Sequence, residues 1–293
     1  MKYLYYPGCA QKSSSRSYER SLLAVCEVLG IKLHEIEDWN CCGTTISISV
    51  SKMVSSYFAA RNLGLANHHK LPVVTPCPSC YISLKRVLKE SQENKNQFYK
   101  INELLAQEDL FFSTDTEVFH VLEFLVNVIG LDCIGEKVRR PLTGFRIAPY
   151  YGCQLISPYA NRGKYDLQDI EKLIETMGGY PVDFPFRTNC CGGSLMFTLK
   201  GQAEKLSSMI IHSILKTDAN LIVTPCGLCQ LNLEIARKRI CREISDHRFL
   251  PILNLGQLLG LAFDIDTRTL SVNRKKYVAK QGSFQIITSQ MKS

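Results

Sequence analysis

The sequence predicts an α/β protein that contains two duplicated, Rossmann-like parallel-sheet domains with cysteine-bearing loops at the carboxyl ends of the strands. Two observations support this fold class. Segments with strand and helix character alternate along the chain, which is typical of a parallel sheet covered by helices. The same order of segments occurs twice, which indicates an internal duplication. We expect an N-terminal domain at 1–139, a C-terminal domain at 140–264 and a basic tail at 265–293.

The first copy opens with a β-rich segment that ends at Pro7-Gly8, followed by apolar residues at helical spacing that stop at Gly30. Periodicity and turn residues define the later elements. In order, we expect a strand at 2–6, a helix at 18–29, a strand at 31–36, a helix at 52–67, a strand at 72–75 and a helix that begins near Pro78. The patterned cysteines then fall on the turns between these elements.

The second copy repeats this order. We expect a strand at 146–150, a helix at 167–177, a strand at 180–184, a helix at 201–216, a strand at 221–223 and a helix that begins near Gly227. The apolar segment 249–263 predicts a helix that closes the second domain, with a contact surface for a partner protein as the alternative. Because ligands of parallel sheets bind at the carboxyl ends of strands, the cysteine-bearing turns of each copy should meet at one edge.

Ten of the thirteen cysteines form two copies of one pattern, in which a single cysteine is followed by an adjacent pair and then by a C-x-x-C. The first copy comprises Cys9, Cys41, Cys42, Cys77 and Cys80, and the second comprises Cys153, Cys190, Cys191, Cys226 and Cys229. In both copies 34 residues separate the adjacent pair from the C-x-x-C, and both pairs stand in the sequence Asn-Cys-Cys-Gly. These ten thiols are the candidate metal ligands.

Several features of the pattern favour metal binding. A C-x-x-C at the start of a helix places two thiols on one turn, and the helix N-terminus lowers their pKa toward the thiolate. The glycine after each cysteine pair lets the backbone approach an inorganic cluster closely. A tetrahedral zinc site or a cubane cluster needs four thiolates, whereas each copy supplies five. Two structural zinc sites, or thioredoxin-like dithiol chemistry at the C-x-x-C turns, are the alternatives.

The repeated pattern resembles the tandem CCG domain of the heterodisulfide reductase B-subunit family, which includes the heterodisulfide reductase-like complexes of sulfur oxidation. The resemblance covers roughly 1–262 and extends to Ala60-Arg61-Asn62-Leu63 and Tyr81, whereas Thr44-Thr45 and the basic tail depart from it. It implies that the five cysteines of each complete copy bind a noncubane [4Fe-4S] cluster, which gives two clusters. Some members carry one cluster, in the C-terminal copy, with zinc or nothing in the N-terminal copy; one cluster plus one zinc is therefore the alternative.

The resemblance also implies a function, that of an iron-sulfur redox subunit in an oxidoreductase that acts on sulfur groups. Paired one-electron steps at the clusters would cleave or form a disulfide, or process sulfur bound to a lipoyl-type carrier. The implied partners are a ferredoxin-like iron-sulfur subunit (C-type) and a flavoprotein subunit (A-type). The alternatives are a zinc-stapled structural or interaction subunit, and the CCG subunit of a quinone-linked succinate or lactate dehydrogenase.

Composition argues against several other classes of protein. The formal charge of +8 falls once ten metal-bound thiolates are counted, so we expect no nucleic-acid partner. No apolar run is long enough to span a membrane and the N-terminus carries no signal-peptide core, so we expect a cytoplasmic protein without a transmembrane segment. The sequence contains no phosphate-cradling or dinucleotide-binding motif, which argues against nucleotide or flavin binding by this chain.

Two further features stand outside the duplicated pattern. Cys26, Cys133 and Cys241 have no patterned partner and are expected to be packing or surface residues. From Thr267 onward the chain has basic residues and no Asp or Glu, which predicts a solvated tail or a docking arm for an acidic partner protein.

Overall fold

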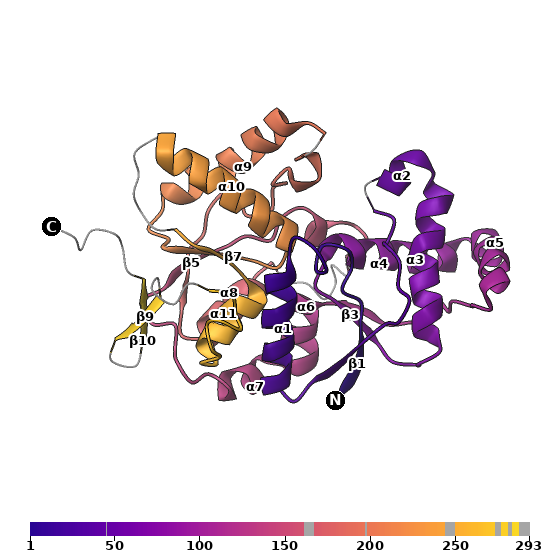
Figure 1. The fold of residues 1–293 in the computed structure, drawn as a ribbon, viewed down its shortest axis with the longest axis horizontal. Helices are drawn as coiled ribbons and strands as arrows, with labels where there is room; N and C mark the ends of the chain where they lie inside the picture. Colours follow the sequence, from indigo (N-terminus) through magenta and orange to yellow (C-terminus); the bar gives the residue numbers. More distant parts are fainter. Residues whose placement is uncertain are drawn as a thin grey trace.

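The fold consists of two four-stranded parallel sheets that lie side by side along the long axis of the molecule (Figure 1). The computed structural model describes residues 1–44, 46–160, 167–196, 198–243, 250–272, 277–280 and 283–286. The first sheet has the strand order β2-β1-β3-β4, and the second has the matching order β6-β5-β7-β8. All pairings within both sheets are parallel, which confirms the predicted α/β class with duplicated Rossmann-like units.

The strands are short and pair at matching positions in the two copies. Their bounds are β1 (Lys2–Tyr5), β2 (Lys32–Glu35), β3 (Val73–Thr75), β4 (Val118–His120), β5 (Arg146–Pro149), β6 (Tyr180–Pro181), β7 (Leu221–Thr224) and β8 (Ile252–Asn254). At the end of β3, Thr75 lies opposite His120, and at the end of β7, Thr224 lies opposite Asn254. Neither β4 nor β8 was expected from the sequence, and β6 is shorter than the strand predicted at 180–184.

Helices connect the strands of the first copy at the predicted places. They are α1 (Arg16–Val28), α2 (Ile46–Val50), α3 (Lys52–Asn67), α4 (Pro78–Glu93) and α5 (Lys95–Leu105), with α6 (Val121–Glu123), a π-helical turn η2 (Phe124–Ile129) and α7 (Leu131–Glu136) after β4. The start of α3 is capped by Ser51, whose side chain accepts a hydrogen bond from the Val54 N–H. Pro78 stands in the first turn of α4, where its missing N–H costs no hydrogen bond.

The second copy has the corresponding helices. They are the short 3₁₀ turn η3 (Gln154–Ile156), α8 (Asp169–Thr176), the 3₁₀ turn η4 (Gly193–Leu195), α9 (Lys200–Leu215), α10 (Gly227–Glu243) and α11 (Leu255–Ala262). The helices predicted at 167–177, 201–216 and from Gly227 are confirmed as α8, α9 and α10.

The prediction for 249–263 was wrong in two respects. The segment contains the strand β8 before the helix α11, because Ile252, Leu253 and Asn254 pair with β7. Asn254 then starts the helix through a capping box with Gln257. Every residue of α11 is buried within the chain, so this helix is not an exposed surface for a partner protein.

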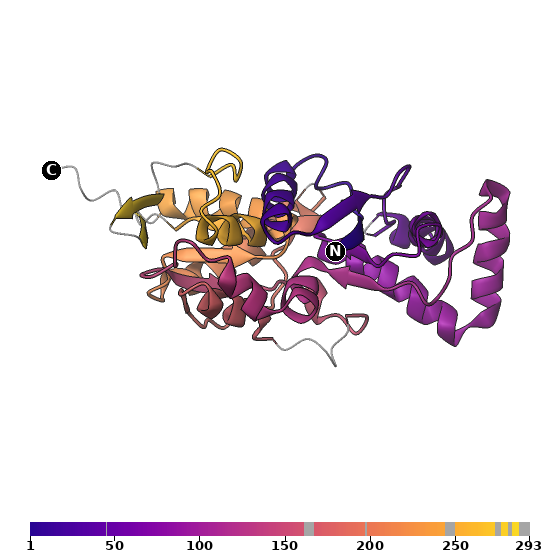
Figure 2. The same ribbon diagram turned by 90° about the horizontal axis from the view of Figure 1, so that it is seen from below.

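The two copies are joined by direct packing of α1 on α11, which lie against each other in the middle of the molecule (Figure 1). Gly256 of α11 allows the close approach, since a Cβ atom there would lie 2.6 Å from the main-chain nitrogen of Leu22 and from Ser21 Oγ. Apolar side chains from both copies belong to one buried core. Figure 2, which shows the molecule from below, also places the two sheets in adjacent halves of one body.

The start of the basic tail is folded against the second copy. Leu270 is fully buried and contacts Gly260 of α11. Further on, β9 (Tyr277–Lys280) and β10 (Ser283–Ile286) form an antiparallel hairpin. Arg274, Lys275, Lys276 and Lys292, on which the predicted solvated or docking tail largely depends, lie outside the described residues.

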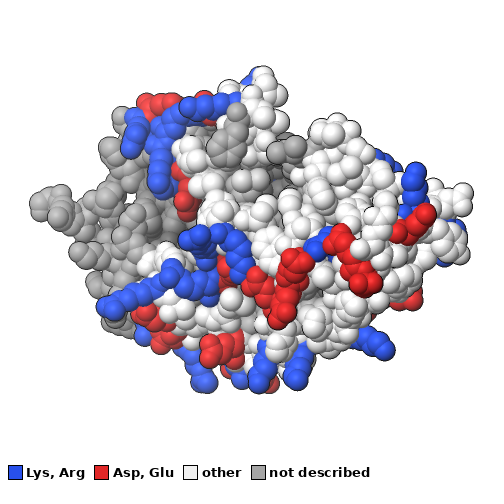
Figure 3. Space-filling model, turned by 45° about the vertical axis from the view of Figure 1, so that its right-hand side comes forward, with Lys and Arg blue, Asp and Glu red and all other residues white. Residues whose placement is uncertain are grey.

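Charged side chains of both signs lie beside one another on the face shown in Figure 3. Lys12, for example, lies 2.7 Å from both Glu19 and Glu35, and Arg61 pairs with Asp38 and Glu108. The basic excess of the composition therefore does not form one uniform surface on that face. Within the described ranges, no helix combines the length and the apolar character needed to cross a membrane.

Candidate metal centres

Each predicted ligand of the two cysteine sets lies directly after a strand of its sheet. Cys9 and Cys153 follow β1 and β5, the adjacent pairs follow β2 and β6, and the C-x-x-C turns follow β3 and β7. Because neighbouring parallel strands end at the same edge, the fold brings each set of five together. The twelve cysteines whose side chains the structure describes are all free thiols.

The five sulfurs of the first set form a continuous chain of contacts. Cys41 exchanges hydrogen bonds with Cys42 and Cys9, which lower the pKa of Cys41 to about 2. Cys80 exchanges hydrogen bonds with Cys42 and Cys77, and these contacts together with burial raise the pKa of Cys80 well above its ordinary value. One thiol thus donates to a neighbour that carries the negative charge, so the set shares its protons among its members.

The second set has the same arrangement. The Cys191 and Cys229 sulfurs lie 3.3 Å apart, and the Cys229 N–H donates to Cys226 Sγ at 3.4 Å. The hydrogen bond from Cys153 lowers the pKa of Cys190 to about 6. Since a metal binds thiolates, loading of either set would release the shared protons.

The adjacent cysteines of each pair point in different directions, as the sequence predicted. Cys41 is exposed whereas Cys42 is buried, and Cys190 is partly exposed whereas Cys191 is buried. One sulfur of each pair therefore faces the interior of its site and the other lies toward the solvent. An adjacent pair of this geometry can bind neighbouring metal atoms of one cluster, but it is not a simple chelating arm.

Glycines before the single cysteines leave room for the sulfurs. At Gly8, which has a φ of +71°, a Cβ atom would lie 2.6 Å from Cys80 Sγ. At Gly152, which has the same φ, a Cβ atom would lie 3.3 Å from Cys229 Sγ. Any other residue at these two positions would meet both backbone strain and a ligand sulfur.

Polar side chains behind the cysteine pairs repeat between the copies, and sequence reasoning missed them. The Ser83 hydroxyl donates to the Cys42 carbonyl at 2.7 Å, and the Asn232 amide donates to the Cys191 carbonyl. Both residues lie three positions after the last cysteine of their C-x-x-C, which is a signal that alignment of the two copies could have given. They fix the backbone of the buried member of each pair.

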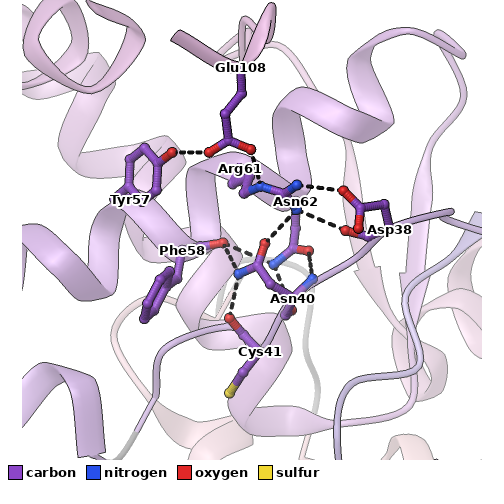
Figure 4. Close-up of polar contacts among 8 residues, drawn as sticks. All are labelled: Asp38, Asn40, Cys41, Tyr57, Phe58, Arg61, Asn62 and Glu108. Carbon is purple, nitrogen blue, oxygen red and sulfur yellow. Dashed lines mark hydrogen bonds and ion pairs between the residues drawn. The ribbon is translucent and has the colours of Figure 1, made fainter. Parts of the chain in front are cut away.

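The first pair is held further by a polar network around Arg61 and Asn62 of α3 (Figure 4). Asn62 accepts a hydrogen bond from the Asn40 N–H at 3.0 Å and donates to the Asn40 carbonyl at 3.0 Å. Arg61 donates to the Asn40 side chain at 3.2 Å while it pairs with Asp38 and Glu108. Asn40 directly precedes Cys41, so this network fixes the backbone that leads into the first cysteine pair.

The residues present fit an iron-sulfur cluster in each set. Thiolates are the donors that iron and zinc bind in soft sites, and five sulfurs in mutual contact exceed the number that one tetrahedral ion requires. In the part of the chain that the structure describes, no three His, Cys, Asp or Glu side chains are grouped around a single ion position.

Comparison with known proteins shows the family. The model of the cysteine-rich domain CCG matches the chain twice, at 3–85 and at 147–234, which together make up more than half of the 293 residues. The chain belongs to the cysteine-rich CCG domain family. Each matched segment of this CCG protein contains one complete set of five cysteines.

Two relatives match the CCG protein over most of their lengths. It is 32% identical over 275 residues to the 8-methylmenaquinol:fumarate reductase membrane anchor subunit of Wolinella succinogenes, which covers 93% of this chain and 95% of that subunit. It is 28% identical over 276 residues to a protein of Archaeoglobus profundus that is similar to the B subunit of heterodisulfide reductase, which covers 91% of this chain and 92% of the relative. The predicted resemblance to the B subunits of heterodisulfide reductases is confirmed.

A solved structure shows the same fold. The crystal structure of a hypothetical protein from Helicobacter pylori superimposes with a TM-score of 0.73 at 14% sequence identity, over 92% of this chain. The CCG protein spans about half, 50%, of the length of that chain. At this identity the likeness concerns the fold alone.

Proposed function

We propose that this chain is the iron-sulfur subunit of a multi-subunit oxidoreductase and that each set of five cysteines holds one noncubane [4Fe-4S] cluster. The observation that carries the proposal is the contact among five thiols at equivalent positions of both copies. The N-terminal cluster would be held by Cys9, Cys41, Cys42, Cys77 and Cys80, and the C-terminal cluster by Cys153, Cys190, Cys191, Cys226 and Cys229. When bound, such clusters supply one-electron transfer.

The protein around each set would tune the bound group. Ser83 and Asn232 hold the carbonyls behind the buried sulfurs, and Gly8 and Gly152 keep the sulfurs accessible. The outer sulfurs Cys9 and Cys41 are exposed, so electron donors or substrates can approach the first set from the solvent. The chain thus provides two redox sites rather than a nucleotide-binding site.

We place the complex first among the quinone-linked fumarate reductases and succinate dehydrogenases. This assignment rests on the 32% identity to the Wolinella succinogenes protein, which extends over nearly the full length of both chains. In such a complex the dicarboxylate is handled by a flavoprotein subunit, and a ferredoxin-like iron-sulfur subunit joins it to this chain. The complex would expose these sites to the cytoplasm.

The second candidate is a reaction on sulfur groups, in which the sites cleave or form a disulfide or process sulfur on a lipoyl-type carrier. The similarity to the heterodisulfide reductase-like protein of Archaeoglobus profundus favours it. Cleavage of a disulfide consumes two electrons and two protons and yields two thiols. Two one-electron sites in one chain match that count of electrons.

An affinity tag on the chain in its native host would separate these candidates. We expect the purified complex to contain a flavoprotein and a ferredoxin-like subunit, and to reduce fumarate with a menaquinol analogue as the donor. Cys42→Ser and Cys191→Ser variants of the same complex should lose this activity, whereas Cys26→Ala, which changes a buried thiol outside both sets, should keep it. Disulfide reduction without fumarate reduction would replace the first candidate by the second, and a complex without either activity would contradict both.

A further inference from the structure

His120 is a buried residue that no part of the cysteine pattern predicts. It ends β4, opposite Thr75 at the end of β3, and its side chain has no exposed surface. The first C-x-x-C turn (77–80) begins two residues after Thr75. The imidazole therefore lies immediately behind the cysteines of the first copy.

The hydrogen bonds of His120 determine where its proton lies. Its Nδ1 atom accepts a hydrogen bond from the Leu122 N–H at 3.1 Å. A neutral imidazole that accepts at one nitrogen carries its proton on the other, so Nε2 is a donor. Burial lowers the pKa of His120 to about 3, which keeps the ring in this neutral form near neutral pH.

The Nε2 atom faces both copies. It has no hydrogen bond of regular geometry, but the main-chain carbonyls of Pro76 and Pro225 are near enough to act on the ring. Pro76 directly precedes Cys77, and Pro225 directly precedes Cys226 at the second C-x-x-C turn (226–229). A single N–H donor thus stands between two acceptors that belong to different cysteine sets.

Tyr18 of α1 gives independent evidence that the two sets meet here. Its buried hydroxyl donates to the Pro225 carbonyl at 3.3 Å. Burial raises its pKa, and the charges of Cys226 and Cys77 raise it further, so one phenol senses a cysteine from each set. The side chain of Ser15, at the start of the same helix, also lies against Gly227 within the second turn.

We propose that His120 is a positioning residue that joins the two C-x-x-C turns, with its Nε2–H shared between the carbonyls of Pro76 and Pro225. By holding the turns together, it sets the separation of the two cysteine sets and the interaction between the clusters that they hold. The part that concerns clusters rests on the proposed function. The link between the turns does not depend on metal.

Hydrogen exchange measured by mass spectrometry tests the link directly. In His120→Phe, which fills the same space without a donor, amides in peptides covering 74–85 and 223–234 should both exchange several-fold faster than in the wild type. His120→Gln, whose amide can donate to the same carbonyls, should restore slow exchange in both. Phe112→Leu, a buried change that contacts Phe98 away from the cysteines, should leave both peptides unchanged.

Faster exchange in 74–85 alone would overturn the proposal, because it would mark His120 as a local packing residue of the first copy. Tyr18→Phe removes only the hydroxyl bond to Pro225 and provides a second measurement if His120→Phe does not fold. It should loosen 223–234 more than 74–85, and equal exchange in both peptides to that of the wild type would contradict a shared anchor.

Electron paramagnetic resonance of the loaded protein tests the consequence for the clusters. His120→Phe should keep the iron content of the wild type but change the spin–spin interaction seen when both clusters are paramagnetic, and His120→Gln should restore it. An unchanged interaction in His120→Phe would contradict control of the clusters by His120. Absence of iron from the wild type would instead contradict the proposed function, while the exchange experiment would still decide the link between the turns.

Discussion

The two copies present the same five cysteines but hold the adjacent pair in different ways. In the first copy, Asn62 of α3 makes hydrogen bonds to both the N–H and the carbonyl of Asn40, just before the pair. The matching contacts of Gly43 with Ser55 and of Gly192 with Ala203 align Asn62 with Ile210, which is buried in the second apolar core. There the Asn189 N–H donates to the Phe186 carbonyl instead. Duplication has kept the ligands and changed their supports.

A second difference lies beside the buried sulfurs. Thr44 places its hydroxyl 3.2 Å from Cys42 Sγ, whereas the equivalent residue of the second copy is Gly193, whose main-chain N–H donates to Cys191 Sγ at 3.3 Å. Hydrogen bonds to ligand sulfurs are one of the factors that set the potential of an iron-sulfur cluster. Equal ligand sets can therefore give two sites with different redox properties.

The largest expected effect is the loss of one cluster at a time. Cys42→Ser and Cys191→Ser should each remove about four of about eight iron atoms, because each variant breaks only one set. Iron and acid-labile sulfide per chain measure this, with Cys26→Ala as the control for a buried thiol outside the sets. Loss of zinc instead of iron in Cys42→Ser would assign the first copy to a structural metal, and unchanged metal in both variants would refute the ligand assignment.

Gly8→Ala and Gly152→Ala should damage the two sites unequally. Each alanine carries a left-handed backbone strain of about 1–2 kcal/mol, but the new methyl lies 2.6 Å from a sulfur in the first copy and 3.3 Å in the second. Gly8→Ala should therefore lose more iron than Gly152→Ala. Iron analysis of both variants checks the order, and a greater loss in Gly152→Ala would contradict the packing described for these turns.

The different supports of the pairs should appear in stability. Asn62→Ala leaves buried polar groups of Asn40 without partners and should lower the free energy of unfolding by about 2 kcal/mol. Ile210→Val only trims an apolar side chain and should lower it by about 1 kcal/mol. Urea unfolding of the two variants measures both values. Equal losses would mean that the polar network contributes no more than packing.

The smallest expected effect is a shift of one reduction potential. Thr44→Val removes the hydroxyl that can donate to the Cys42 thiolate, so the potential of the N-terminal cluster should fall while that of the C-terminal cluster stays constant. Thr44→Ser keeps the hydroxyl and should behave like the wild type. A redox titration followed by paramagnetic resonance measures both clusters, and a shift in Thr44→Ser equal to that in Thr44→Val would remove the role of the hydroxyl.

The cysteine sets and most elements could be predicted because their signals are local. A fixed spacing marks the ten thiols, and periodicity marks helices such as α3 and α10. By contrast, β4 has three residues, too few to show a period, and β8 merges in sequence with the apolar helix that follows it. Pairing with β3 and β7 creates these strands, so only the folded sheet reveals them.

The supports of the sites depend even more on tertiary structure. Nothing in the sequence near His120 or Tyr18 links them to the cysteines, which are distant along the chain. Packing of α1 against the second copy brings Tyr18 to Pro225, and the parallel register of β4 brings His120 behind Cys77. Residues of this kind are found only once the two copies are seen together.

The most direct test of the central claim is the content of iron, zinc and acid-labile sulfide per chain in anaerobically purified wild-type protein. Two equivalent five-thiol sites predict about eight iron and about eight sulfide per chain, with no stoichiometric zinc. Two zinc atoms without sulfide would contradict the account, since the duplicated cysteines would then be structural and the chain would have no redox centre of its own.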